Sequence, residues 1–71
     1  RNYAKAAEWF LRAAEQGYTA AQFNLGLLYE EGEGVEQDHE EAIKWYRKAA
    51  EAGDIDAQSK LELINKTKKG K

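Results

Sequence analysis

The sequence has 71 residues, a net charge of −2 and a charged fraction of 34%, and it contains no Cys and no Pro. This length permits one small domain, and the absence of Cys excludes a disulfide framework and a thiolate metal site. No apolar run approaches the roughly 18 residues of a membrane span, so we expect neither a membrane partner nor a targeting segment.

One stretch of the sequence occurs twice, first over residues 6–22 and again over residues 42–58, with a period of 36 residues. The period pairs Trp9 with Trp45. An internal period of roughly 20–50 residues indicates stacked supersecondary units. Since residues that favour helices also dominate the composition, we predict an all-α fold of antiparallel helix-turn-helix repeats.

The first predicted helix covers residues 3–16, with Asn2 as its N-cap and Gly17 as its stop. The second predicted helix covers residues 20–31. It is preceded by Thr19-x-x-Gln22, which has the form of a capping box.

Gly26 lies in the middle of the second predicted helix, where a Gly costs about 1 kcal/mol relative to Ala. We interpret Gly26 as a point where a neighbouring helix approaches closely. Gly32 ends the helix and Gly34 lets the following loop turn. Val35 is the only apolar residue of that loop, and we predict that it packs back onto the helix pair.

Asp38 is predicted to cap a third helix over residues 39–52, and Asp54 a fourth over residues 55–68. Loops this short make consecutive helices antiparallel neighbours. Acidic residues gather in residues 30–41 and lysines in residues 66–71. We predict that this lysine tail pairs with the acidic loop.

The second and third predicted helices and their loop carry the pattern Ala21-Gln22-x-x-Leu25-Gly26-x-x-Tyr29-x-x-Gly32-x-Gly34-Val35-x-x-Asp38-x-x-x-Ala42-x-x-Trp45-Tyr46-x-Lys48-Ala49-Ala50-Glu51-x-Gly53. The pattern resembles the Sel-1-like repeat, a relative of the tetratricopeptide repeat. The period of 36 residues separates it from the tetratricopeptide repeat, whose period is about 34. The resemblance divides the chain into a half repeat (1–17), a complete repeat (18–53) and a capping half repeat (54–71).

The resemblance implies a short right-handed α-solenoid of four helices, about two repeats. It also implies a protein-interaction scaffold that has no catalytic residues and no cofactor. By analogy, the first helix of each repeat lines a concave face that binds a protein or peptide partner. Phe23 and Leu27 have an alternative place inside the solenoid. The predicted partner-binding residues are Phe23, Leu27, Glu30, Glu31 and Leu63.

The two ends of the chain depart from the repeat pattern in opposite directions. In the fourth predicted helix Glu62 stands where the second has Gly26, and Ser59 and Asn65 are polar replacements as well, which favours a C-terminal cap. The first predicted helix is apolar nearly all round and lacks a partner helix before it. We predict that it mediates a symmetric homodimer, unless the chain is part of a longer array. The predicted self-association residues are Tyr3, Ala7, Phe10 and Leu11.

The alternative function is therefore a self-associating or designed repeat unit whose main partner is another copy of itself. Enzyme activity is not predicted, because the only His is His39 and no nucleophile elbow, P-loop or zinc-binding spacing is present. We predict no metal site and no nucleic-acid partner, since the lysine tail of this acidic chain has no interleaved aromatic residues. Trp9 and Trp45 are interpreted as packing between helices.

Overall fold

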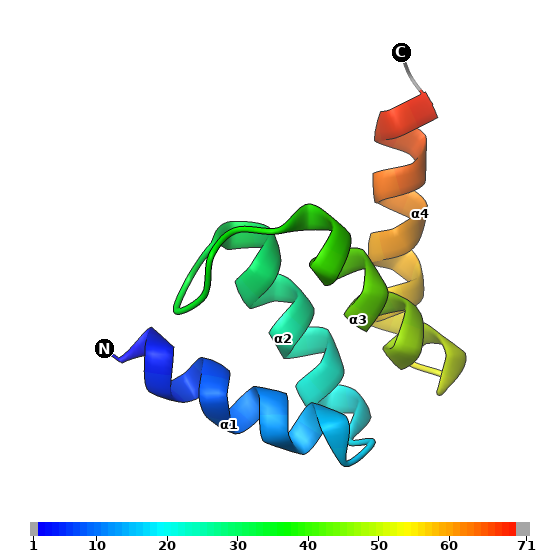
Figure 1. Ribbon diagram of the computed structural model, residues 1–71. Helices are drawn as coiled ribbons and strands as arrows, with labels where there is room; N and C mark the ends of the chain where they lie inside the picture. Colours follow the sequence, from blue (N-terminus) through cyan, green and yellow to red (C-terminus); the bar gives the residue numbers. More distant parts are fainter. Residues whose placement is uncertain (1, 70–71) are drawn as a thin grey trace.

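Four α-helices make up most of the chain (Figure 1). The computed structural model describes the backbone of residues 2–69 and the side chains of residues 2–66. The helices are α1 (Tyr3–Glu15), α2 (Thr19–Glu31), α3 (His39–Glu51) and α4 (Ile55–Lys69), and the described residues form no strand. The all-α prediction is confirmed, and each predicted helix end lies within one residue of the observed one.

Consecutive helices pack as antiparallel neighbours along a stack (Figure 1). Helix α2 lies between α1 and α3, and α4 packs against α3. Helices α1 and α4 therefore lie at opposite ends of the stack, each with one closely packed neighbour. This arrangement confirms the predicted solenoid of stacked hairpins.

Three of the predicted polar N-caps form. Each of these side chains accepts hydrogen bonds from backbone N–H groups two or three residues further along the chain, at 3.0–3.1 Å. Such caps satisfy backbone donors that have no partner inside the helix. The capping residues are Asn2, Asp38 and Asp54.

The capping box predicted at the start of α2 is wrong. Helix α2 begins at Thr19 itself, and its N-cap Tyr18 makes no side-chain hydrogen bond to the helix. The Nε2 of Gln22 instead donates to the carbonyl oxygen of Ala14 in α1, at 3.2 Å. Carbonyls in the last turn of a helix have no partner within it. The Ala14 carbonyl accepts both from the Gly17 N–H, at 3.0 Å, and from the Gln22 amide that a capping box would have used.

Small residues line the contacts between the helices and let their backbones approach closely. The core cluster combines these with a few large side chains, and Val35 from the α2–α3 loop packs against it, as predicted. Dense packing of this kind makes the core sensitive to small changes of volume. Its buried members are Ala7, Ala14, Ala21, Leu25, Leu28 and Trp45.

Two glycines mark places where no side chain fits. A methyl group at Gly26 would lie 2.5 Å from Cε1 and 2.6 Å from Cδ1 of Tyr46, which confirms the predicted close approach of a neighbouring helix. Gly34 has a φ of +78° and faces the carbonyl oxygen of Tyr3, at the start of α1. The α2–α3 loop is therefore held against α1 by backbone contact.

The prediction that both tryptophans pack between helices is confirmed for Trp45 and wrong for Trp9. Trp45 is 6% exposed and belongs to the core cluster, whereas Trp9 is 70% exposed. The two residues occupy equivalent repeat positions. Trp9 is exposed because α1 ends the described stack, so no helix covers the face that carries it.

Candidate protein-interaction surface

The ring of Tyr46 on α3 is buried against the middle of α2. Its hydroxyl group donates to Oε1 of Glu30 at 2.6 Å. The half-buried ring of Phe23 lies 5.6 Å from the Tyr46 ring, centroid to centroid, at an interplanar angle of 41°. Two of the predicted partner-binding residues thus make contacts within their own chain, and Phe23 supports the packing alternative.

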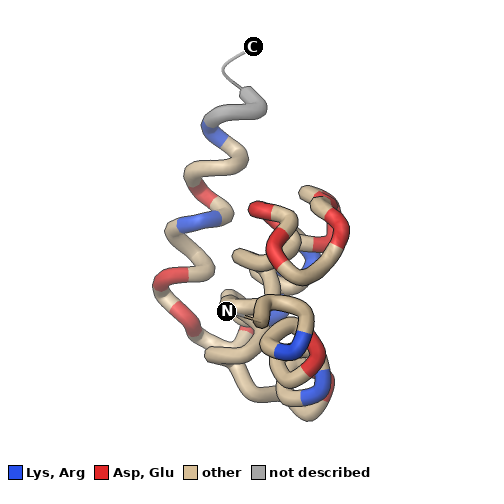
Figure 2. Tube along the Cα trace, turned by 90° about the vertical axis from the view of Figure 1, so that its left-hand side faces the viewer, with Lys and Arg blue, Asp and Glu red and all other residues tan. Residues whose placement is uncertain are grey.

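Lys60 links α4 to this cluster. Its Nζ lies 3.0 Å from Oε1 and 3.3 Å from Oε2 of Glu30, and both side chains are largely shielded from solvent. Charges of both signs follow one another along α4 (Figure 2). Among the α4 side chains that the structure describes, Lys60 is the one paired with the acidic end of α2. The predicted pairing of the lysine tail rests mostly on side chains that lie outside the described residues.

The surroundings of Glu30 and Tyr46 shift both of their pKa values. Burial alone would raise the pKa of Glu30, but the hydrogen bond from Tyr46 and the Lys60 ammonium outweigh it and lower the pKa. Burial, followed by the hydrogen bond to Glu30 and its negative charge, raises the pKa of Tyr46. At neutral pH the cluster therefore holds a carboxylate between a hydroxyl donor and an ammonium group.

A groove of about 520 Å³ opens between α3 and α4, beside this ion pair. Its rim is polar and comes from the Glu30–Lys60 pair, His39 and Glu40. Exposed apolar surface next to a few fixed polar groups is typical of binding sites. The apolar lining residues are Ala42, Ile43, Leu63 and Ile64.

The structure brings only two of the predicted partner-binding residues, Glu30 and Leu63, to this groove. Leu27 is half-buried on α2, and Glu31 is exposed at the end of that helix. Sequence reasoning missed Ile43 and the other α3 residues of the groove. The analogy assigned the binding face to the first helix of each repeat alone, whereas the groove needs both helices of a hairpin.

The predicted self-association residues lie at different depths on α1. Ala7 is 4% exposed and belongs to the core, and Phe10 and Leu11 are half-buried against it. Of the four, Tyr3 is the most exposed, at 42%. The outward face of α1 is instead carried by Trp9, which lies in a shallow hollow with Lys5, Glu8 and Arg12.

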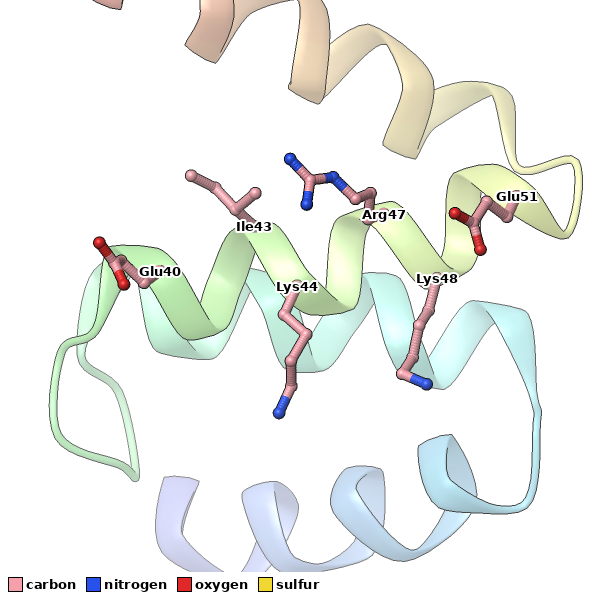
Figure 3. A pocket seen from close by; sticks show the side chains of 6 residues that line it. All are labelled: Glu40, Ile43, Lys44, Arg47, Lys48 and Glu51. Carbon is pink, nitrogen blue, oxygen red and sulfur yellow. The ribbon is translucent and has the colours of Figure 1, made fainter.

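The outer face of α3 has a different character. A shallow hollow of about 460 Å³ there is lined mainly by acidic and basic side chains. Lys44 and Lys48 point to the side of α1 (Figure 3). These two ammonium groups lie 5.7 and 5.8 Å from the Trp45 ring centroid, within the range of cation–π attraction. Ile43 and Arg47 point to the side of α4 (Figure 3).

Two further findings concern the part of the chain that the structure describes. No group of three or more His, Cys, Asp or Glu residues there is placed to hold a metal ion. None of the described helices combines the length and the hydropathy that crossing a membrane requires.

Stacked antiparallel hairpins with a 36-residue period and an open groove define a helical-repeat protein of the solenoid class. The Sel1 repeat model matches residues 1–18 and 19–54, so the chain belongs to the Sel1 repeat family. The resemblance inferred from the sequence is confirmed. Sel1 repeats are generally protein-interaction modules.

Solved structures with the same fold support this assignment. A Sel1 repeat protein from Oxalobacter formigenes superposes with a TM-score of 0.87 at 51% identity, over 89% of this chain and 26% of the other. A protective antigen of uropathogenic Escherichia coli with an SLR fold gives a TM-score of 0.79 at 47% identity, over 80% of this chain and 12% of the other.

Curated relatives match shorter stretches. DAP3-binding cell death enhancer 1 of Rattus norvegicus is 42% identical over 41 residues, which is 58% of this chain and 8% of that protein. An ERAD-associated E3 ubiquitin-protein ligase component of Arabidopsis thaliana, HRD3B, is 45% identical over 42 residues, or 59% of this chain and 7% of that protein. The chain thus spans less than a tenth of the length of these two relatives.

Proposed function

We propose that the chain is a protein-interaction module that binds a peptide segment of a partner in the α3–α4 groove. The observation that carries this proposal is the placement of apolar side chains from two helices beside the fixed Glu30–Lys60 ion pair. The apolar floor suits one or two aliphatic or aromatic side chains of the peptide. The charged rim suits polar groups that flank them.

A peptide-display selection with a matched pair of variants tests this proposal. Leu63→Glu places a charge in the groove, whereas Ile55→Glu places one on an exposed apolar residue of the same helix that does not line the groove. Peptides selected on the wild-type chain should bind Ile55→Glu unchanged and lose most of their affinity for Leu63→Glu. Equal binding to both variants would place the site elsewhere.

We also propose self-association through α1 as a second function. The large exposure of Trp9, next to the partly exposed Tyr3, favours it. A self-complementary patch closes by two-fold symmetry. Light scattering over a dilution series should then give a dimer that Trp9→Glu converts to a monomer. A well-folded wild-type monomer at every concentration would contradict this second function.

A further inference from the structure

Three contacts on α2 hold the ring of Tyr46. Phe23 packs against the ring, Gly26 lets the ring approach the helix backbone, and Glu30 accepts the hydrogen bond of the hydroxyl group. We call Phe23, Gly26 and Glu30 the aromatic socket. The socket joins the two helices of the complete repeat, α2 and α3.

Helix α4 is the next helix of the same type as α2, and its contacts with α3 repeat those of α2 with α1. Gln58 donates to the carbonyl oxygen of Ala50 at 3.1 Å, as Gln22 does to Ala14 at 3.2 Å. Ala57 is fully buried, and its equivalent Ala21 is buried as well. The two helices therefore have the same register in the stack.

All three positions of the socket have changed on α4. Ser59 stands in place of Phe23, Glu62 in place of Gly26 and Lys66 in place of Glu30. The three replacements are exposed. Ser59 supplies no ring, and Lys66 is no hydrogen-bond acceptor. Glu62 has the largest consequence, because even a Cβ atom at the equivalent position on α2 would lie 2.5 Å from the Tyr46 ring.

The helix that would occupy such a socket is present at the other end of the chain. In α1, Phe10 is equivalent to Tyr46, and the exposed Trp9 is equivalent to the buried Trp45. A second copy could therefore present its α1 to the α3–α4 hairpin, just as α3 packs on the α1–α2 hairpin. Repetition of that contact would be head to tail, which gives rings where the rotation closes and open-ended fibres where it does not.

The outer face of α3 adds a second obstacle to this contact. Arg47 stands on α3 where α1 has Leu11, a residue half-buried against the core. In Figure 3 the guanidinium group of Arg47 points to the side of α4, over the hairpin that the second copy would cover. Burying an unpaired guanidinium group is unfavourable.

We infer that α4 excludes a second copy of this chain from docking head to tail, and that Glu62 is the residue that closes the socket. The aliphatic groove beside it stays open to a peptide, whereas a helix of the repeat type is rejected. Pairing of α1 with α1, as proposed above, does not use the socket and is unaffected.

The test restores the socket on one chain and offers it the α1 of another. The acceptor is Trp9→Glu/Arg47→Leu/Ser59→Phe/Glu62→Gly, whose own α1 is blocked and from which both obstacles are removed. The donor is the wild-type chain. Light scattering of the mixture should show a complex of one acceptor with one donor. An acceptor with Glu62→Ala should give none, because a methyl group already fills the place of the ring.

Two results of the mixing experiment would overturn the inference. One is a folded acceptor, checked by circular dichroism, that forms no complex with the donor. The other is equal complex formation when Glu62 is kept or changed to Ala, since the blocking residue would then lie elsewhere.

A second measurement needs no variant and so does not depend on how Glu62→Gly folds. In amide NMR spectra of the wild-type chain over a dilution series, we expect any concentration-dependent shifts to be confined to α1. Shifts that appear together on α1 and around Ser59, Glu62 and Lys66 would show head-to-tail contact and would overturn the inference.

Discussion

Helices α1 and α3 occupy equivalent places in the repeat, yet they differ in what covers them. Trp45 on α3 is buried in the core, whereas Trp9 on α1 is the equivalent residue and is mostly exposed. The helix faces are alike in sequence, with Ala13-Ala14 in one and Ala49-Ala50 in the other. The difference arises from the neighbours, because the α1–α2 hairpin covers Trp45 and nothing in the described chain covers Trp9.

This comparison shows that a repeat sequence specifies half of an interface and the next helix in the stack supplies the other half. Each repeat contacts only its neighbours, so stability is approximately a sum of repeat and interface contributions. The same side chain therefore contributes stability inside the stack and binding surface at its end.

Substitution of the two tryptophans should give the largest difference. Trp45→Ala leaves a large cavity in the core and should lower the free energy of unfolding by about 3–5 kcal/mol. Trp9→Ala removes an exposed side chain and should change it by about 0.5 kcal/mol or less. Urea unfolding followed by circular dichroism measures both values. Equal losses would mean that Trp9 is as well packed as Trp45.

The next largest effect concerns equivalent positions on α2 and α4, namely Gly26 and Glu62. Gly26→Ala places a methyl group against the Tyr46 ring and should cost about 1–3 kcal/mol through overpacking, although Ala is the better helix former. Glu62→Ala at the equivalent exposed position of α4 should cost less than about 0.5 kcal/mol. The same unfolding measurement compares them. A stabilising Gly26→Ala would show that α2 and α3 are free to move apart.

Sequence reasoning was sufficient for the features that depend on nearby residues or on the repeat period. The period of 36 residues gave the stacking, and the caps Asn2, Asp38 and Asp54 depend only on contacts within a helix turn. The close approach at Gly26 was also predictable, because a mid-helix glycine is unfavourable unless a neighbour requires it.

Sequence reasoning failed where the partner of a side chain lies on another helix. In the sequence, Gln22 fits a capping box as well as it fits a contact with another helix. Its actual partner, the Ala14 carbonyl, comes into reach only when α1 is packed against α2. The Glu30–Lys60 pair joins residues 30 positions apart, so no local pattern reveals it. Only Glu30 and Leu63 of the groove were predicted, since the family analogy places the binding face on the first helix of each repeat and α3 is a second helix.

Removal of the Tyr46 hydroxyl group should have a smaller, pH-dependent effect. Tyr46→Phe deletes the donor to Glu30 and should lower the free energy of unfolding by about 1.5 kcal/mol at neutral pH. Tyr18→Phe, at an exposed tyrosine, is the control and should change nothing measurable. Equal unfolding midpoints for the two variants would mean that the 2.6 Å hydrogen bond contributes no net stability.

The stability deficit of Tyr46→Phe should shrink on both sides of neutral pH. Because the pKa of Glu30 is lowered in the folded state, its contribution is present above the ordinary value of 4.5 and is lost as the pH falls through the folded pKa. Because the pKa of Tyr46 is raised, its contribution is present below the ordinary value of 10.0 and is lost as the pH rises beyond it. A stability deficit that stays constant from acid to alkaline pH would mean that the hydrogen bond does not depend on the ionisation of Glu30 and Tyr46.

The smallest expected effect separates the two equivalent glutamines. Gln22 is buried, so Gln22→Leu keeps most of its volume but removes one of the two donors to the Ala14 carbonyl, at a cost of about 1 kcal/mol; the Gly17 N–H remains as the other donor. Gln58 is exposed, and water can replace its amide at Ala50, so Gln58→Leu should cost about 0.5 kcal/mol or less. Hydrogen exchange of amides near each site measures the local loss. If both variants lose equally, burial inside the stack does not set the value of this contact, and the contrast between inner and end positions would be limited to the apolar core.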